Sequence, residues 1–223
     1  MGKLIVLEGI DGSGKSTQMG LLTAALTQQG VPYRQLRFPC YGTPGCVPVE
    51  QYLAGAYGSR PGDVNAYAAS TFYAVDRYAS YKQDWGEYYR AGGLLVADRY
   101  TTSNAVHQAP KLLPEEREPY LRWLYDLEFN RMGLPQPDLV LYLDMPTEAA
   151  AAMRARREQD TGTQADIHER DEEYLRLCRQ VGLQTAELLG WRVVSCAEGL
   201  QVRAAADIHA EVLRAVMELV NPQ

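Results

Sequence analysis

The 223-residue chain has no long apolar run and no N-terminal targeting segment. Its apolar stretches, such as residues 4–7 and 139–143, are far shorter than the roughly 18 residues that span a bilayer. A single Lys precedes the first strand-like run, without the apolar region and small-residue cleavage site of a signal peptide. We therefore expect no membrane segment and a cytoplasmic location.

An excess of positive charge and paired cysteine motifs are also missing. The 28 acidic and 22 basic residues give a formal charge of -6, which opposes nonspecific attraction to nucleic acids or anionic membranes. Cys40, Cys46, Cys178 and Cys196 form no C-x-x-C pair and no Cys/His knuckle, so we expect free thiols rather than a zinc or redox site. The ordinary 46% hydrophobic content predicts one folded domain over residues 1–223.

Five short aliphatic runs alternate with longer helical patterns, as in stacked βαβ units. We therefore predict an α/β fold with a five-stranded, mostly parallel sheet and helices on both faces. Ligands of such sheets bind beyond the carboxyl ends of the strands. The predicted strands cover residues 3–8, 33–38, 94–99, 138–144 and 191–196.

A phosphate-loop motif follows the first predicted strand and precedes a helix predicted over residues 15–29. Residues 9–17 read Gly-Ile-Asp-Gly-Ser-Gly-Lys-Ser-Thr, and their glycines let successive backbone N–H groups and the helix N-terminus hold a phosphate. Lys15 adds positive charge for the β- and γ-phosphates, and the Ser16 hydroxyl ligates Mg2+. The residues predicted to bind the triphosphate are Gly9, Asp11, Gly12, Ser13, Gly14, Lys15, Ser16 and Thr17.

Further charged residues indicate a phosphotransferase of the P-loop NTPase fold. A GTPase switch would need a base-reading Asn-Lys-x-Asp stretch, which the chain lacks. At the end of the third strand, Asp98 suits a role in the Mg2+ shell, and Arg99 would be useful if a second phosphate arrives. These two residues and Lys15 are our first catalytic candidates.

A charge-rich segment over about residues 147–172 is predicted to form a helical lid. Arg154, Arg156 and Arg157 lie on a helix that begins near Thr147, and Arg154 and Arg157 share one face. A lid would bring them to the two phosphates, so Arg154 and Arg157 complete the catalytic candidates. A second insertion, over about residues 39–91, contains a helix predicted from residue 65 to residue 91.

The chain resembles the thymidylate kinases from residue 3 to about residue 216. The resemblance rests on residues 7–17, on the Arg-Phe-Pro of residues 37–39, on the Asp-Arg-Tyr of residues 98–100 with the Ser-Asn that follows, and on the lid end at residues 166–169. It implies transfer of the γ-phosphoryl group of ATP to dTMP with Mg2+, giving dTDP and ADP, by a homodimer.

The same resemblance implies the roles of individual residues. Tyr73 would stack on thymine and Arg77, four residues later on the same helix face, would bond a base carbonyl. Ser103 and Asn104 would face the base edge, and His107 would lie beside C2' of the sugar. Asp11 would face the 3'-hydroxyl. The implied acceptor-binding residues are Asp11, Arg37, Phe38, Tyr73, Arg77, Arg99, Ser103, Asn104 and His107.

Three departures from the family pattern bear on the acceptor and on catalysis. Tyr73 stands where Phe is usual, Tyr41 stands where many relatives carry Arg, and Gly12 stands where some relatives carry an Arg in the phosphate loop. Relatives without that loop Arg supply lid arginines instead.

Two alternative functions stay open: a kinase for another nucleoside monophosphate or a deoxynucleoside, and a non-catalytic nucleotide-binding regulator.

Overall fold

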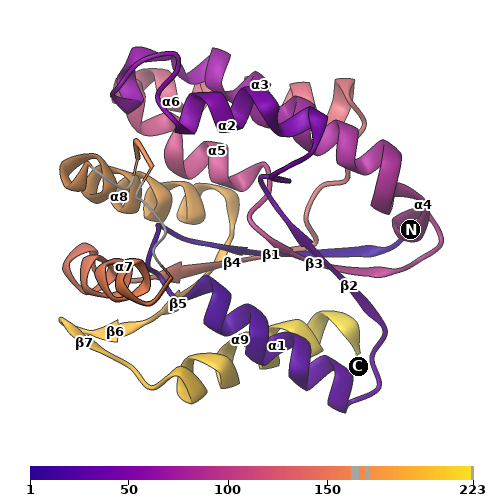
Figure 1. Cartoon of the computed structure of the whole chain (residues 1–223). Coiled ribbons are helices and arrows are strands. Elements are labelled where there is room, and N and C mark those ends of the chain that lie inside the picture. The colour runs from indigo at the N-terminus through magenta and orange to yellow at the C-terminus, as the bar shows by residue number, and fades with distance from the viewer. Residues whose placement is uncertain (162–165, 169–170, 222–223) are drawn as a thin grey trace.

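A five-stranded parallel sheet forms the centre of the molecule (Figure 1). The computed structural model describes residues 1–161, 166–168 and 171–221, without the side chains of residues 157, 158, 160 and 161. The strand order is β2-β3-β1-β4-β5, which confirms the predicted α/β class. The strands are β1 (Lys3–Glu8), β2 (Tyr33–Arg37), β3 (Leu94–Asp98), β4 (Leu139–Asp144) and β5 (Arg192–Ser195).

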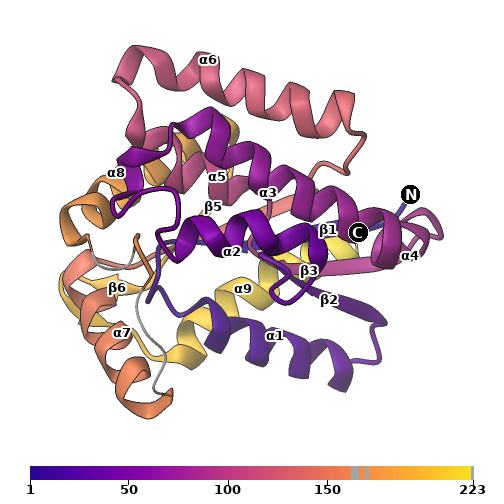
Figure 2. The ribbon, with the colours of Figure 1, turned by 45° about the horizontal axis from the view of Figure 1, so that its top comes forward.

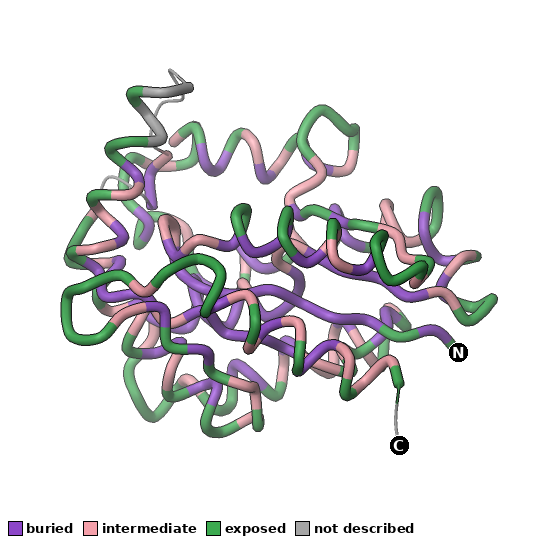
Figure 3. Tube along the Cα trace, turned by 90° about the horizontal axis from the view of Figure 1, so that it is seen from below, coloured by how far each residue is buried: buried purple, intermediate pink, exposed green. Residues whose placement is uncertain are grey.

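Strand β1 is the most deeply buried element, because it lies between β3 and β4 and is covered on both faces. Every residue of β1 after Lys3 is buried, which accounts for its continuous apolar run. Figure 3 shows the buried strands running through the middle of the molecule, with the exposed positions on the outer sides of the helices. Since all five strands are parallel, their carboxyl ends meet at one edge of the sheet.

Helices cover both faces of the sheet. Helices α1 and α9 lie side by side on one face, and the other face carries α3, α5 and α8 (Figure 1). Helix α2 packs on α3, and α7 lies near the carboxyl ends of the strands (Figures 1 and 2). The helices are α1 (Lys15–Gln28), α2 (Val47–Leu53), α3 (Ala66–Ser80), α4 (Gly86–Arg90), α5 (Thr102–His107), α6 (Pro114–Tyr125), α7 (Thr147–Thr161), α8 (Glu172–Leu189) and α9 (Ala205–Val220). Shorter elements are the 3-10 turns η1 (Pro44–Cys46), η2 (Pro61–Asp63) and η4 (Ala109–Lys111), the π turns η3 (Tyr81–Trp85) and η5 (Asp126–Arg131), and the two-stranded antiparallel sheet of β6 (Ala197–Glu198) and β7 (Gln201–Val202).

The single α-helix predicted over residues 65–91 is wrong in its middle. The π turn η3 separates α3 from α4, and the Gly86 N–H bonds the Tyr81 carbonyl five residues back. A Cβ at Gly86 would lie 2.5 Å from that carbonyl oxygen, so only glycine fits there. The wider turn buries Trp85 completely, with its indole N–H donating to Ser80 Oγ at 3.0 Å.

The four cysteines are free thiols, as predicted, and three of them are buried. Among the residues that the structure describes, no helix combines the length and the apolar character that crossing a membrane requires.

Candidate active site

A cavity of about 640 Å³ opens at the carboxyl ends of the strands. Residues 11–17 of the phosphate loop line one end of it. Residues 37–39 at the end of β2, residues 98 and 99 at the end of β3, side chains of α3, α5 and α7, and residues 166 and 168 line much of the rest. The cavity therefore lies where an open parallel sheet binds its ligands.

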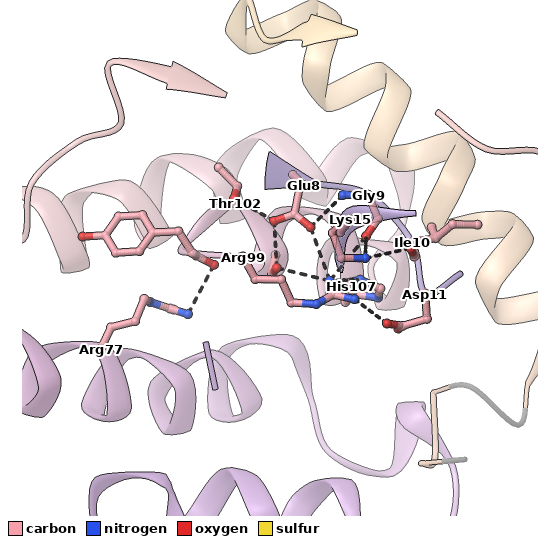
Figure 4. A network of polar contacts seen from close by, with 11 residues as sticks. Glu8, Gly9, Ile10, Asp11, Lys15, Arg77, Arg99, Thr102 and His107 are labelled. Carbon is pink, nitrogen blue, oxygen red and sulfur yellow. Dashed lines mark hydrogen bonds and ion pairs between the residues drawn. The ribbon is translucent and has the colours of Figure 1, made fainter. Parts of the chain in front are cut away.

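The phosphate loop is closed by its own lysine. Lys15 Nζ donates to the carbonyl oxygens of Gly9 and Ile10, both at 2.9 Å, and the side chain is buried in the loop (Figure 4). Burial and the nearby Arg99 lower the pKa of Lys15. Gly14, with a left-handed φ of 88°, turns the chain into the first turn of α1.

Helix α7, which lies in the predicted lid segment, touches the phosphate loop at two places. Gly12 has a φ of 84°, and a Cβ there would lie 2.3 Å from the Ala150 carbonyl oxygen. Arg154, which is 5% exposed, donates from Nη1 to the Asp11 carbonyl oxygen at 2.9 Å. Position 12 thus has no room for a side chain, and a lid arginine lies beside the loop instead. The side chain of Arg157 lies outside the described part of the structure.

Arg99 adopts a left-handed backbone conformation, with a φ of 68°, which is costly for a residue other than glycine. Its guanidinium lies 2.5 Å from Asp11 Oδ1, 3.3 Å from Glu8 Oε1 and 3.0 Å from His107 Nε2 (Figure 4). Burial alone would lower the pKa of Arg99, but these two carboxylates raise it. For Asp11, burial is likewise outweighed by Arg99 and Lys15, so its pKa is lowered.

Glu8 is a candidate functional residue that was not predicted from the sequence. Its side chain is fully buried and accepts from the Gly9 N–H at 3.0 Å, from Thr102 Oγ1 at 2.8 Å and from Ser103 Oγ at 2.7 Å. It thereby ties the start of the phosphate loop to Arg99 and to the start of α5. An acidic residue at the end of an otherwise apolar strand was the signal that could have found it.

Asp98 and Ser16 fit a Mg2+ site. Asp98 Oδ1 is buried and has no hydrogen-bond partner in the described part of the chain, so this carboxylate lacks the compensation that burial requires. Both residues line the cavity next to the phosphate loop. Mg2+ in nucleotide sites keeps several waters and takes only one or two carboxylates plus phosphate oxygens, so two protein ligands suffice.

The acceptor half of the cavity is lined by most of the residues that the resemblance indicated. Tyr73 of α3 reaches the lining, whereas the neighbouring Phe72 packs against Tyr52 and Tyr57. Tyr41, which stands where many relatives carry Arg, also lines the cavity, two residues after the cis peptide bond between Phe38 and Pro39. The predicted acceptor residues in the lining are Asp11, Arg37, Phe38, Tyr73, Arg99, Ser103, Asn104 and His107.

Arg77 is the one predicted acceptor residue outside the lining. It is 1% exposed, and Glu128 binds it through two hydrogen bonds, at 2.7 Å from Nε and 2.5 Å from Nη2. Its Nη2 also donates to Asn104 Oδ1 at 3.1 Å, and Figure 4 shows it apart from Asp11 and Arg99. In this structure Arg77 therefore reaches the cavity through Asn104, and its direct contact with a base stays a prediction.

Known proteins are similar to this chain over most of its length. A family model described as thymidylate kinase matches residues 7–203. The thymidylate kinase of Mycobacterium tuberculosis is 34% identical over 192 residues, covering 84% of this chain and 87% of that protein. The thymidylate kinase of Chromobacterium violaceum is 34% identical over 223 residues, covering 95% and 92%. A solved thymidylate kinase from Candida albicans has the same fold, with a TM-score of 0.69 and 20% identity, covering 98% and 92%.

Proposed function

This chain belongs to the thymidylate kinase family and phosphorylates dTMP to dTDP with ATP, and we propose that the cavity at the carboxyl ends of the strands is where it does so. The convergence of Lys15, Arg99 and Arg154 on the phosphate loop supports this most directly. Phosphoryl transfer between two anions depends on fixed cations that position and neutralise the reacting groups. We take residues 1–223 to be one kinase domain.

On the donor side, the proposed roles follow the loop geometry. The backbone N–H groups of the loop hold the β-phosphate of ATP, and Lys15 moves from the loop carbonyls to the transferring phosphoryl group. Arg154 approaches the same group from α7. The proposed ATP-binding residues are Gly9, Asp11, Gly12, Ser13, Gly14, Lys15, Ser16 and Thr17.

On the acceptor side, Arg37 and Arg99 bind the phosphate of dTMP, and Tyr73 stacks on thymine. Ser103 and Asn104 face the polar edge of the base. Arg77 holds Asn104 Oδ1, and Asn104 Nδ2 donates to the Ser70 carbonyl oxygen at 3.5 Å, so one N–H of the amide is left for the base. Asp11 and His107, which both contact Arg99, would lie nearest the sugar. Asp98 and Ser16 would hold Mg2+, which would neutralise charge on the transferring phosphate.

Asp98→Asn is expected to lower kcat at least about tenfold and to raise the Mg2+ concentration for half-maximal rate, because an amide is a poorer Mg2+ ligand than a carboxylate. Initial rates over a Mg2+ titration measure both effects. Asp84→Asn, at an exposed carboxylate paired with Arg34, is the matched control and should behave as wild type. An unchanged Mg2+ dependence in Asp98→Asn would remove Asp98 from the metal site.

A panel of acceptors should rank dTMP above UMP and CMP by about a hundredfold or more in kcat/KM. A site that hydrogen-bonds one base edge leaves buried polar groups unpaired with the wrong base. ADP release with ATP and Mg2+ is the measurement, with dUMP, AMP, GMP and thymidine included. Thymidine should be poor, because Arg37 and Arg99 would have no anion to bind. AMP or CMP as the best acceptor would contradict the pocket assignment.

An exposed apolar face of α3 bears on the assembly of the protein. The exposed face of α3 carries Tyr67, Val75 and Tyr78, which are 38%, 50% and 39% exposed. Together with the resemblance, this apolar face supports a homodimer formed through α3. We also propose a cytoplasmic location, no nucleic-acid partner and no membrane partner, in keeping with the net charge of -6.

A further inference from the structure

The end of the lid segment, at residues 166–168, packs against α2, in the second insertion over about residues 39–91. Ile167 is 4% exposed and packs in an apolar cluster with Val49 and Leu53 of α2. Its N–H donates to the Leu53 carbonyl oxygen at 3.4 Å. Segments more than a hundred residues apart in the sequence therefore meet beside the cavity.

Three polar side chains continue this contact, and we call Tyr52, Lys111 and His168 the lid dock. His168 Nε2 lies 2.8 Å from Tyr52 Oη, and Tyr52 Oη accepts from Lys111 Nζ at 2.8 Å. Lys111 Nζ also donates to the Val64 carbonyl oxygen at 2.8 Å. The lid dock thus links the lid end, α2 and the turn η4.

The direction of these hydrogen bonds follows from the groups involved. A lysine ammonium has donors only, so Tyr52 Oη accepts from Lys111, and the tyrosine hydrogen can be donated to His168 Nε2. An Nε2 that accepts requires the neutral imidazole with its proton on Nδ1. Burial, with Lys111 nearby, lowers the pKa of His168 to about 3, which agrees with a neutral ring. Tyr52 and Lys111 therefore hold the orientation of the His168 ring.

His168 belongs to the cavity wall, whereas Tyr52 and Lys111 lie behind it. The His168 ring is nearly parallel to the ring of His107, with centroids 5.9 Å apart and an interplanar angle of 6°. Tyr52 also meets Tyr73 edge to face, with centroids 6.4 Å apart. Tyr52 thus contacts the rings of Tyr73 and His168, which line the acceptor half of the cavity, without lining the cavity itself.

We propose that Tyr52 and Lys111 are positioning residues of the acceptor site, which set its affinity for the nucleoside monophosphate by holding His168 in the cavity wall. The proposal rests on the proposed function of this cavity. The lid dock contacts the acceptor wall and lies outside the phosphate loop, so acceptor binding should depend on it and ATP binding should not. A role in packing alone would instead lower stability without separating the two substrates.

A double-mutant cycle tests this proposal. Tyr52→Phe keeps the ring and removes the hydroxyl, and His168→Leu removes the acceptor nitrogen. Each should raise the KM for dTMP about five- to tenfold, with kcat and the KM for ATP within about twofold of wild type. The double variant should be no worse than the more affected single variant, because both remove the same hydrogen bond.

Two further variants serve as a rescue test and a control for the double-mutant cycle. His168→Gln places an amide near Nε2 that can accept from Tyr52, and it should keep the KM for dTMP within about twofold. Tyr57→Phe is the matched control, because Tyr57 is exposed, packs on the same Phe72 ring and bonds Gln51 instead of the lid. The proposal would be overturned if the two substitutions raised the KM for dTMP additively. It would also be overturned if the KM for ATP rose equally, or if Tyr57→Phe raised the KM for dTMP as much as Tyr52→Phe does.

Hydrogen exchange at the Ile167 amide, followed by NMR, reports on the lid dock without any turnover. It should be faster in Tyr52→Phe and in His168→Leu than in wild type or Tyr57→Phe. If wild type fails to phosphorylate dTMP while exchange responds in this way, the proposed function fails and the lid dock stands. If wild type phosphorylates dTMP and neither the KM for dTMP nor the exchange responds, the positioning role is wrong and the function stands.

Discussion

Lys15→Ala is expected to lower kcat by about a thousandfold or more while the protein stays folded. The Lys15 ammonium is the one cation carried by the phosphate loop itself, and its loss leaves the transferring phosphoryl group without that neutralisation. The side chain bonds two loop carbonyls and has no place in the main apolar core, so the free energy of unfolding should change little. Initial rates at saturating ATP and dTMP measure the effect.

Two controls separate chemistry from folding in this experiment. Lys82→Ala removes an exposed lysine of η3 and should match wild type in rate and in thermal midpoint. ATP affinity, measured by equilibrium binding to Lys15→Ala, should fall much less than kcat, because the backbone N–H groups of the loop remain. A Lys15→Ala protein that is folded and turns over at a near-normal rate would refute the assignment of the phosphate loop.

The sheet and the phosphate loop could be predicted from the sequence because local patterns specify them. The apolar run that ends at Glu8 is long enough to mark a buried strand, and the glycines after it mark the turn into α1. The predicted strand boundaries agree with the structure to within a residue at each end. By contrast, β6 and β7 have two residues each, which is too short for any periodicity to register.

The parts of the site that could not be predicted depend on pairs distant in sequence. Arg77 is bound by Glu128, 51 residues away, and nothing in the spacing of α3 indicates that partner. The lid dock joins Tyr52 to His168, which are 116 residues apart, and neither residue by itself indicates a functional site in the sequence. The left-handed backbone of Arg99 is likewise stabilised by carboxylates from β1 and the loop, so only the folded chain shows how its guanidinium is aimed.

The contact between α7 and the phosphate loop explains why position 12 carries no side chain. The Ala150 carbonyl oxygen occupies the space that a side chain at Gly12 would need. Packing against α7 therefore prevents position 12 from carrying an arginine. The same helix places Arg154 within hydrogen-bond distance of the loop backbone, so we expect α7 to supply the cation that position 12 lacks.

Replacement of Arg154, Arg156 and Arg157 by alanine together is expected to lower kcat by about a hundredfold or more, and Arg154→Ala alone by at least about tenfold. Arginines that stabilise phosphoryl-transfer transition states contribute about 10³ to 10⁵ in rate elsewhere, and three neighbouring residues allow partial redundancy. A cation that meets the phosphates on lid closure binds the transition state more than the ground state, so kcat should fall more than apparent dTMP affinity. Steady-state kinetics in both substrates give this comparison.

The matched control is Arg122→Ala combined with Arg131→Ala, since both arginines are largely exposed on α6 and η5, away from the cavity. That variant should keep the wild-type kcat. If the triple lid variant also turns over at the wild-type rate, α7 is only a charged surface helix. The second cation would then have to be Arg37 or Arg99, because these are the other arginines in the cavity lining of the described chain.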